Sequence, residues 1–268
     1  MNIRSLILPI NRCNLPGYVL ASLAYQRSPV ELELDGILPH FADLFTRLRH
    51  YHTPKERAEC FTNYMAVRFR LPGHELESWP EAEPVPRPSA NYRRLLLGWL
   101  FDSDSDAGAV WRWWVESRFG LRTLYHKEPI PDFDDPAYMR FMQACGRGLY
   151  NTNDLETQLD LLYYYCQSEL AYRHPHQTHL SLYRGGNGQE SLFRSGEIPI
   201  VCFNNLSSFT HDPDEAYRFG SNIYSVQVPI SKIVCFDTLL PGSLEGESEY
   251  MVLGGLYPVT RGSSVSKV

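Results

Sequence analysis

Three glutamates, Glu245, Glu247 and Glu249, occupy alternate positions near the end of the chain. They lie directly before the aromatic and aliphatic segment Tyr250–Leu253, which is typical of a buried strand, so the acids are expected where a loop becomes a strand. Successive strand residues point to opposite faces, and Glu247 and Glu249 would therefore share one face. Two carboxylates this close repel each other, which perturbs at least one pKa unless a cation joins them. The alternative interpretation is a solvated acidic loop before an edge strand.

A second candidate motif comes earlier, where the predicted strand His179–Tyr183 runs into Arg184 and Gly185. An arginine at a strand end can grip phosphate through two parallel hydrogen bonds. Glycine lets the backbone approach a ligand closely. Alone this motif is weak, because an arginine followed by glycines is also a common turn.

Between these two motifs, Ser208, Phe209 and Thr210 place hydroxyl groups on either side of an aromatic ring. They come just before a predicted short helix, Asp212–Phe219, which has a capping aspartate and a proline in its first turn. Alone this segment could be a strand followed by a helix cap.

Two clusters carry residue types that bind metals, but neither has a complete ligand set. The first begins like a calcium loop and lacks the glycine and the final glutamate at the required offsets, so helix N-capping is the better interpretation. The second has a His-x-His pair with a third histidine nearby, and no cysteine or carboxylate partner alongside. We therefore predict no metal in the chain. The clusters are Asp102, Asp104 and Asp106, and His174, His176 and His179.

The composition is that of a globular protein. The chain has 268 residues, of which 43% are hydrophobic and 13% aromatic, enough to bury a sizeable core. A net charge of −6 argues against a sequence-independent nucleic-acid binder. No apolar run approaches the length of a membrane span, and no leader peptide opens the chain. The six scattered cysteines form no Cys-x-x-Cys pair, which favours free thiols and a cytoplasmic location.

The pattern of apolar residues predicts an α+β fold, with a mostly helical half followed by a mostly antiparallel β half. We expect a helical region over residues 1–176 and a β core over 177–268, or one continuous domain with the helices of 136–172 on the core. The proline-rich stretch Pro72–Pro88 is expected to be an extended connection. The predicted helices are Pro16–Gln26, His40–Tyr51, Thr53–Arg70, Ala90–Phe101, Gly108–Phe119, Pro136–Leu149, Asp154–Tyr172 and Asp212–Phe219. The predicted strands are His179–Tyr183, Ile198–Phe203, Ile223–Val228, Lys232–Phe236 and Tyr250–Leu253.

In their order along the chain, the arginine, serine and glutamate motifs resemble the arginine–serine–glutamate class of mono-ADP-ribosyltransferases. Ala216 and Phe219 in the short helix add to this resemblance, which covers the C-terminal third. It implies an ADP-ribosyltransferase-like β core and NAD as the donor co-substrate. The chain has no Gly-x-Gly-x-x-Gly after a strand, so NAD is not expected on a dinucleotide-binding βαβ unit.

The resemblance implies that Glu249 is the catalytic glutamate, which holds the ribose 2′-hydroxyl and stabilises an oxocarbenium-like transition state. Glu247 would orient the acceptor guanidinium and assist its deprotonation, because arginine is otherwise always protonated. Glu245 and Glu247 are competing frames for the acceptor-side acid. We prefer the later frame because Tyr250–Leu253 supplies the strand expected directly after the catalytic glutamate.

The same resemblance assigns NAD binding to the two earlier motifs. Arg184 would clamp the pyrophosphate or ribose side of NAD, beside Tyr183, and Gly185 would offer backbone groups to the nicotinamide amide. Ser208 would hold the catalytic glutamate in place. Phe209 would shape the pocket near the nicotinamide, although many members of the class have a small hydroxyl residue there.

The corner Asn11–Pro16, the helical half and the overall length resemble the dinitrogenase reductase ADP-ribosyltransferases of nitrogen-fixing bacteria. That resemblance implies an arginine of the nitrogenase iron protein, carrying ADP, as acceptor, with Leu239–Gly246 reading it. It also implies a PII-type nitrogen-signal protein as partner. The alternatives are an NAD glycohydrolase, which uses water as acceptor, and a non-enzymatic module that binds NAD.

Overall fold

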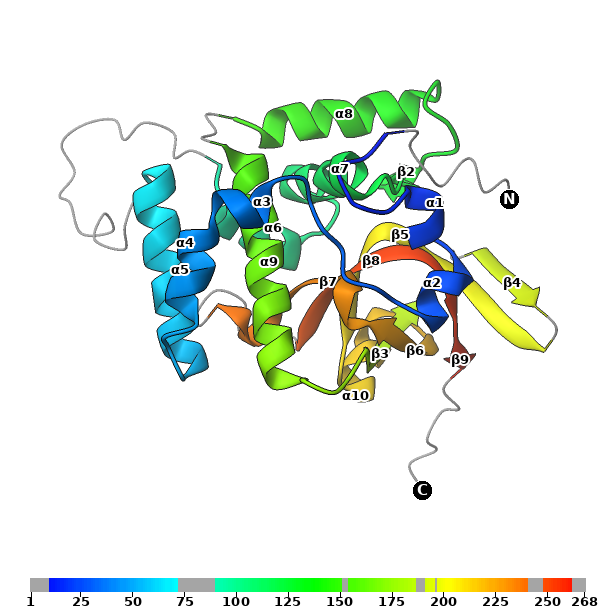
Figure 1. Ribbon diagram of the computed structural model, residues 1–268. Coiled ribbons are helices and arrows are strands. Elements are labelled where there is room, and N and C mark those ends of the chain that lie inside the picture. The colour runs from blue at the N-terminus through cyan, green and yellow to red at the C-terminus, as the bar shows by residue number, and fades with distance from the viewer. Residues whose placement is uncertain are drawn as a thin grey trace.

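The computed structural model describes residues 10–71, 90–150, 154–186, 191–195, 197–240 and 248–261. Helices dominate the first half of the chain and strands the second, which confirms the predicted α+β class (Figure 1). The predicted extended connection Pro72–Pro88 lies outside the described residues.

The helices begin largely where local signals predict. At α5, Thr53 and Glu56 form a capping box, in which each side chain accepts the backbone N–H of the other residue. The predicted helix Pro16–Gln26 is instead two short helices, because Ser22 starts a new one by accepting a hydrogen bond from the N–H of Tyr25. The helices are α1 (Gly17–Leu20), α2 (Leu23–Arg27), α3 (Ile37–His40), α4 (Ala42–Leu48), α5 (Pro54–Phe69), α6 (Tyr92–Phe101), α7 (Asp106–Phe119), α8 (Pro136–Gly148), α9 (Leu155–Arg173) and α10 (Pro213–Phe219).

The aspartates before α7 do not cap it as predicted. Ser105 is the N-cap, and its hydroxyl accepts a hydrogen bond from the N–H of Gly108. Asp102 follows the end of α6, and its carboxylate accepts from the backbone N–H of Asp104. The serine hydroxyl satisfies the first turn, which leaves the aspartate side chains for other contacts.

The main sheet contains seven strands within the described residues, in the order β7-β8-β5-β3-β6-β9 with β4 paired to β5. Every strand pair is antiparallel. Two strands, β1 and β2, form a separate hairpin that was not predicted. The strands are β1 (Tyr125–His126), β2 (Glu128–Pro129), β3 (His179–Gly186), β4 (Ser191–Ser195), β5 (Ile198–Thr210), β6 (Asn222–Pro229), β7 (Ile233–Phe236), β8 (Glu249–Pro258) and β9 (Thr260–Arg261).

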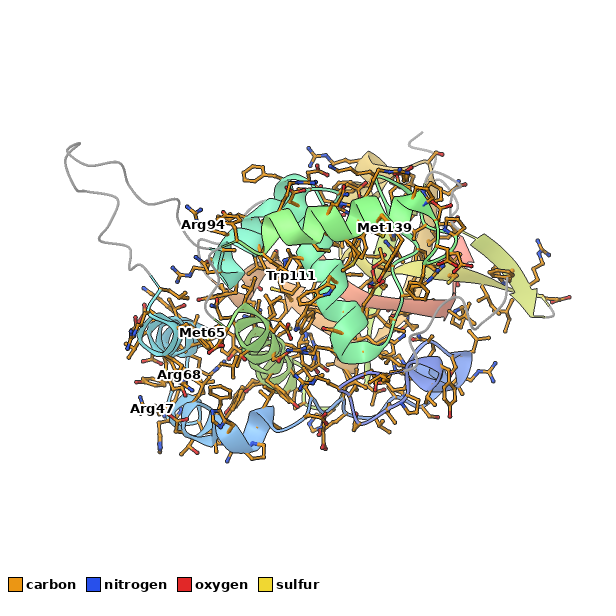
Figure 2. All side chains as sticks on the ribbon, turned by 90° about the horizontal axis from the view of Figure 1, so that it is seen from above. Arg47, Met65, Arg68, Arg94, Trp111 and Met139 are labelled. Atoms are coloured by element: carbon orange, nitrogen blue, oxygen red, sulfur yellow. The ribbon has the colours of Figure 1, made fainter. Side chains whose placement is uncertain are left out.

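The helical half packs directly on the sheet. Helix α9 lies against β7, α7 against β5 and α2 against β8, while α10 covers β3 at the lower edge of the view (Figure 1). Trp111 of α7 is fully buried, whereas Met139 lies exposed on the outer helix α8 (Figure 2). One buried cluster contains residues of both halves, including Trp111, Trp114 and Phe119 of α7. The domain division at residue 176 remains a prediction.

Two features considered in the sequence are membrane-spanning helices and the state of the cysteines. No helix in the described ranges is both long and apolar enough to cross a membrane. All six cysteines are free, and four of them are buried, as expected for thiols in an apolar interior.

Candidate active site

The antiparallel register brings the three motifs into one row across the sheet. Tyr183 of β3 lies opposite Thr210 of β5, and Thr210 lies opposite Glu249 of β8. Glu249 is the first residue of β8, as the sequence predicted for an acid where loop becomes strand. The three motifs lie more than twenty residues apart along the chain. Strand pairing, and not local sequence, therefore brings them together.

A cavity of about 1150 Å³ opens where these strands separate. Within the described residues, β3 and β5 pair only at Tyr183 and Thr210, and Thr210 is the last residue of β5, so the rest of β5 is not paired with β3. One wall of the cavity carries Arg184, Ser208 and Glu249 from the sheet. The opposite wall comes from the end of α6, the loop after it and the β1–β2 hairpin. Its volume slightly exceeds the range usual for pockets that bind drug-sized ligands.

The carboxylate of Glu249 is held by a tryptophan of the helical half. The indole Nε1–H of Trp99 in α6 donates to Oε1 of Glu249 at 2.8 Å and to Oγ of Ser208 at 3.2 Å. Trp99 is 2% exposed, while Ser208 and Glu249 are half-buried. The serine and glutamate of the two motifs thus share one hydrogen-bond donor.

Arg184 also contacts the serine motif. Its Nη1 donates to the backbone oxygen of Ser208 at 2.6 Å. Its guanidinium carbon lies 5.9 Å from the centroid of the Phe209 ring and 6.0 Å from that of Phe203. Both distances are within the range of a cation–π interaction, so the two rings support the guanidinium at the cavity wall. Phe209 itself is 3% exposed.

Gly185 lets α10 pack closely on β3. A Cβ at this position would lie 2.1 Å from the backbone oxygen of Ala216 and 2.8 Å from the nitrogen of Gly220. Ala216 is fully buried, and both Ala216 and Phe219 line the cavity. The structure therefore explains this glycine by helix packing beside the site. Its predicted contact with nicotinamide remains a prediction.

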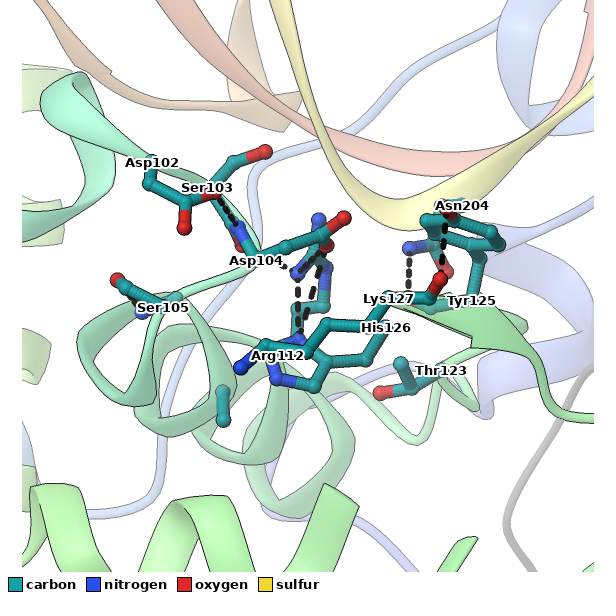
Figure 3. Close-up of polar contacts among 12 residues, drawn as sticks. Asp102, Ser103, Asp104, Ser105, Arg112, Thr123, Tyr125, His126, Lys127 and Asn204 are labelled. Atoms are coloured by element: carbon teal, nitrogen blue, oxygen red, sulfur yellow. Dashed lines mark hydrogen bonds and ion pairs between the residues drawn. The ribbon is translucent and has the colours of Figure 1, made fainter. Parts of the chain in front are cut away.

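Buried Arg112 of α7 organises the opposite wall (Figure 3). Its Nη1 donates to the backbone oxygen of Ser103, to Oδ1 of Asp104 at 3.0 Å and to Nδ1 of His126 at 2.9 Å. Burial lowers the pKa of Arg112 to about 10, and the like charge of Arg184 contributes while Asp104 opposes the shift. Burial, followed by the nearby Arg112, also lowers the pKa of His126 to about 4, so this imidazole is neutral near pH 7.

Two asparagines at a bulge in β5 attach that wall to the sheet. The pairing of β5 with β8 shifts register between Phe203 and Leu206, and Asn204 and Asn205 occupy the bulge. Asn204 accepts from the N–H of Leu124 at 2.8 Å and donates to the oxygen of Tyr125 at 2.8 Å (Figure 3). Asn205 donates to the backbone oxygens of Arg112 and Leu121. The bulge thus sets the distance between the two walls.

Some predicted site residues lie elsewhere. Glu245 and Glu247 fall outside the described residues, so the choice between them as acceptor-side acid remains a prediction. Of the three histidines considered for a metal, His179 lies in β3 with its Nε2 2.7 Å from the backbone oxygen of Gln26. Across the part of the chain that the structure describes, no group of three or more metal-ligating side chains is close enough to hold an ion.

Sequence reasoning missed Trp99, the two asparagines as structural contacts, and the β1–β2 hairpin. Trp99 lies within a predicted helix but was given no role in the site, because its partner Glu249 is 150 residues away in the chain. The proline and charged residues around Tyr125–Pro129 suppress a strand signal. The contacts of Trp99 and of the two asparagines join segments that are far apart in the chain, so no local pattern could have identified them.

The arginine, serine and glutamate on adjacent strands around one cavity are the arrangement expected of the arginine–serine–glutamate class of mono-ADP-ribosyltransferases. Residues 10–261 match the family model "Dinitrogenase reductase ADP-ribosyltransferase (DRAT)", and the chain belongs to this family. A protein of Rhodospirillum rubrum named NAD(+)--dinitrogen-reductase ADP-D-ribosyltransferase is 37% identical over 256 residues, covering 93% of this chain and 93% of that protein. No solved structure matches the chain.

Proposed function

We propose that this chain transfers ADP-ribose from NAD to an arginine of dinitrogenase reductase, the iron protein of nitrogenase. The modification inactivates the iron protein and switches off nitrogen fixation. Family membership and the name of the Rhodospirillum rubrum relative support this proposal. The observation that carries it is the convergence of Arg184, Ser208 and Glu249 on one cavity.

The donor half of the reaction breaks the bond between the nicotinamide nitrogen and C1′ of the ribose. The electron pair of that bond leaves with nicotinamide, and positive charge develops on the ribose as in glycoside cleavage. Glu249 would stabilise this charge and hold the 2′-hydroxyl, because a fixed carboxylate favours a developing cation. Arg184 would hold the diphosphate, and Phe209 would limit the pocket beside the nicotinamide.

The acceptor half forms a bond between C1′ and a guanidinium nitrogen, which loses a proton. An arginine side chain is a poor nucleophile because it is protonated at all ordinary pH values. Glu247 would orient the acceptor and take this proton, with Glu245 as the competing acid. Leu239–Gly246 would contact the acceptor protein, which we expect to carry ADP.

Regulation belongs to the same proposal. A PII-type nitrogen-signal protein would act as activating partner, through the helical half. We expect the enzyme in the cytoplasm, and we expect it to need no metal.

The test is an incubation of the protein with labelled NAD and ADP-loaded iron protein, with and without PII protein. Mass spectrometry then determines whether an arginine gains one ADP-ribose. Glu249→Gln should lower the rate by at least about 100-fold, the usual cost of losing a transition-state electrostatic contact. Glu215→Gln is the matched control, because Glu215 lies on α10 outside the cavity lining and pairs with Arg218.

The outcomes separate the candidate functions. Modification by the wild type and by Glu215→Gln, but not by Glu249→Gln, supports the transferase. Free ADP-ribose without modified arginine indicates a glycohydrolase. NAD binding without turnover, even with PII protein, indicates a binding module. Full activity in Glu249→Gln contradicts the assigned catalytic glutamate.

A further inference from the structure

The donor that holds Glu249 comes from outside the three motifs and from the other half of the chain. Trp99 lies in the last turns of α6, and its indole N–H is shared between Oε1 of Glu249 and Oγ of Ser208. The 2.8 Å contact to the carboxylate is in the range of a charge-assisted hydrogen bond, which is stronger than one between neutral groups. We propose that Trp99 is a positioning residue that fixes the catalytic carboxylate, an inference that rests on the proposed function.

Trp99 is itself held rigidly. Its side chain is 2% exposed, and the guanidinium carbon of Arg112 lies 5.1 Å from its ring centroid. The same Arg112 is bonded to Asp104 and His126 in the wall opposite the sheet. An indole has two side-chain torsions and one donor, so once buried it can offer its N–H in one direction only.

The position of this donor matters because Glu249 stands at the beginning of a strand. The preceding residue, Ser248, has a φ of 47°, in the left-handed region, so the backbone turns sharply just before the carboxylate. A half-buried glutamate there has several rotamers open to it, and a fixed donor selects one of them. The carboxylate is then oriented before the substrate binds, which lowers the cost of reorganisation in the transition state.

The competing interpretation is that Trp99 only fills the core below the cavity. Trp111 provides a matched control for this possibility. It is a fully buried tryptophan of the same half, and its Nε1 has no hydrogen-bond partner among the described residues. Trp111→Phe removes an indole N–H and the same side-chain volume as Trp99→Phe, but it breaks no contact with a catalytic group.

The kinetic test measures nicotinamide release and arginine modification for the wild type, Trp99→Phe and Trp111→Phe. A lost charge-assisted hydrogen bond predicts that Trp99→Phe lowers kcat by about 10- to 100-fold. KM for NAD should change by less than about threefold, since the contact acts on the carboxylate and not on bound substrate. The acidic limb of the pH–rate profile should move to higher pH, because the donor stabilises the ionised carboxylate. Trp111→Phe should keep its kcat within about twofold.

A second variant covers the case in which Trp99→Phe does not fold. It carries 3-benzothienylalanine at position 99, which keeps the bicyclic shape and lacks the N–H. Wild-type kcat in either folded variant at position 99, or an equal loss in Trp111→Phe, would overturn the positioning role.

A measurement without turnover keeps this inference separate from the proposed function. In the protein labelled with ¹⁵N-tryptophan, the indole signal that Trp99→Phe removes should shift with pH in the wild type and stay constant in Glu249→Gln. A signal that does not shift in the wild type overturns the inference. A shifting signal in a protein that leaves arginine unmodified supports the hydrogen bond while the transferase function fails.

Discussion

Buried Glu116 provides a quantitative test of the electrostatics behind the cavity wall. It lies in α7 with 3% of its surface exposed, and its Oε1 accepts a hydrogen bond from the N–H of Thr123 at 2.6 Å. Tyr138 donates to its Oε2 at 3.4 Å. Burial outweighs these contacts and raises the pKa of Glu116 to about 7. Thr123 leads directly into the β1–β2 hairpin, so this carboxyl group supports the wall opposite the sheet.

The sign of the pH effect follows from the raised pKa. The pKa of Glu116 moves from 4.5 in the unfolded chain to about 7 in the folded one. The stability that the protonated form provides is complete below pH 4.5 and is lost as the pH rises through 7. At about 1.4 kcal/mol for each pKa unit, the loss is up to about 3 kcal/mol.

Glu116→Gln keeps the shape and the acceptor for Thr123 but cannot ionise. We expect it to be more stable than the wild type by about 1 to 3 kcal/mol at pH 8 and to differ by less than about 1 kcal/mol at pH 5. Urea unfolding at intervals between these pH values gives both free energies. The lowered pKa of His126 acts in the opposite direction, but it affects both proteins equally and cancels in the difference.

Glu59→Gln is the control, since Glu59 is an exposed glutamate on helix α5 and its replacement removes the same charge at the surface. A difference between Glu116→Gln and the wild type that stays constant from pH 5 to pH 8 would refute the assigned burial effect.

Two further substitutions test packing and buried charge. Gly185→Ala should lower stability by about 1 to 3 kcal/mol and reduce activity, because its Cβ would lie 2.1 Å from the oxygen of Ala216 and displace α10. Gly146→Ala is its control, because the new Cβ would have no atom within 4 Å apart from its chain neighbours and the backbone of its own helix, and it should stabilise α8 by about 0.5 to 1 kcal/mol. Thermal unfolding compares the two variants. A Gly185→Ala variant as stable as the wild type would contradict the close packing. Lys232 is fully buried, its Nζ donates to the oxygen of Gly254 at 2.9 Å, and burial lowers its pKa well below the usual value. Lys232→Met should therefore match or exceed the wild type in urea unfolding at pH 7, by up to about 4 kcal/mol, whereas a large loss would show that the lysine stabilises the fold.

The order of the predicted helices and strands and the identity of the motifs follow from local patterns in the chain. Helix starts such as the Thr53–Glu56 capping box are local, because the bonded groups lie within one turn. The start of β8 near Glu249 could also be predicted, because the apolar run after the acids indicates a buried strand. The family resemblance rested on the types and order of three short motifs, which can be recognised without any knowledge of the fold.

The predicted end of a strand was wrong where polar residues interrupt its apolar pattern. The strand predicted over Ile198–Phe203 continues to Thr210, because the bulge at Asn204 and Asn205 directs their amides to partners in the helical half. Polar residues at a bulge reduce the alternation on which strand prediction relies.

The assembly of the candidate site depends on contacts between segments that are far apart in the chain. The row from Tyr183 through Thr210 to Glu249 depends on strand register, which no local pattern specifies. The hydrogen bond from Trp99 to Glu249 joins residues 150 positions apart and required both halves of the chain to be packed together. Local sequence supplied the chemical groups, and long-range pairing placed them around one cavity.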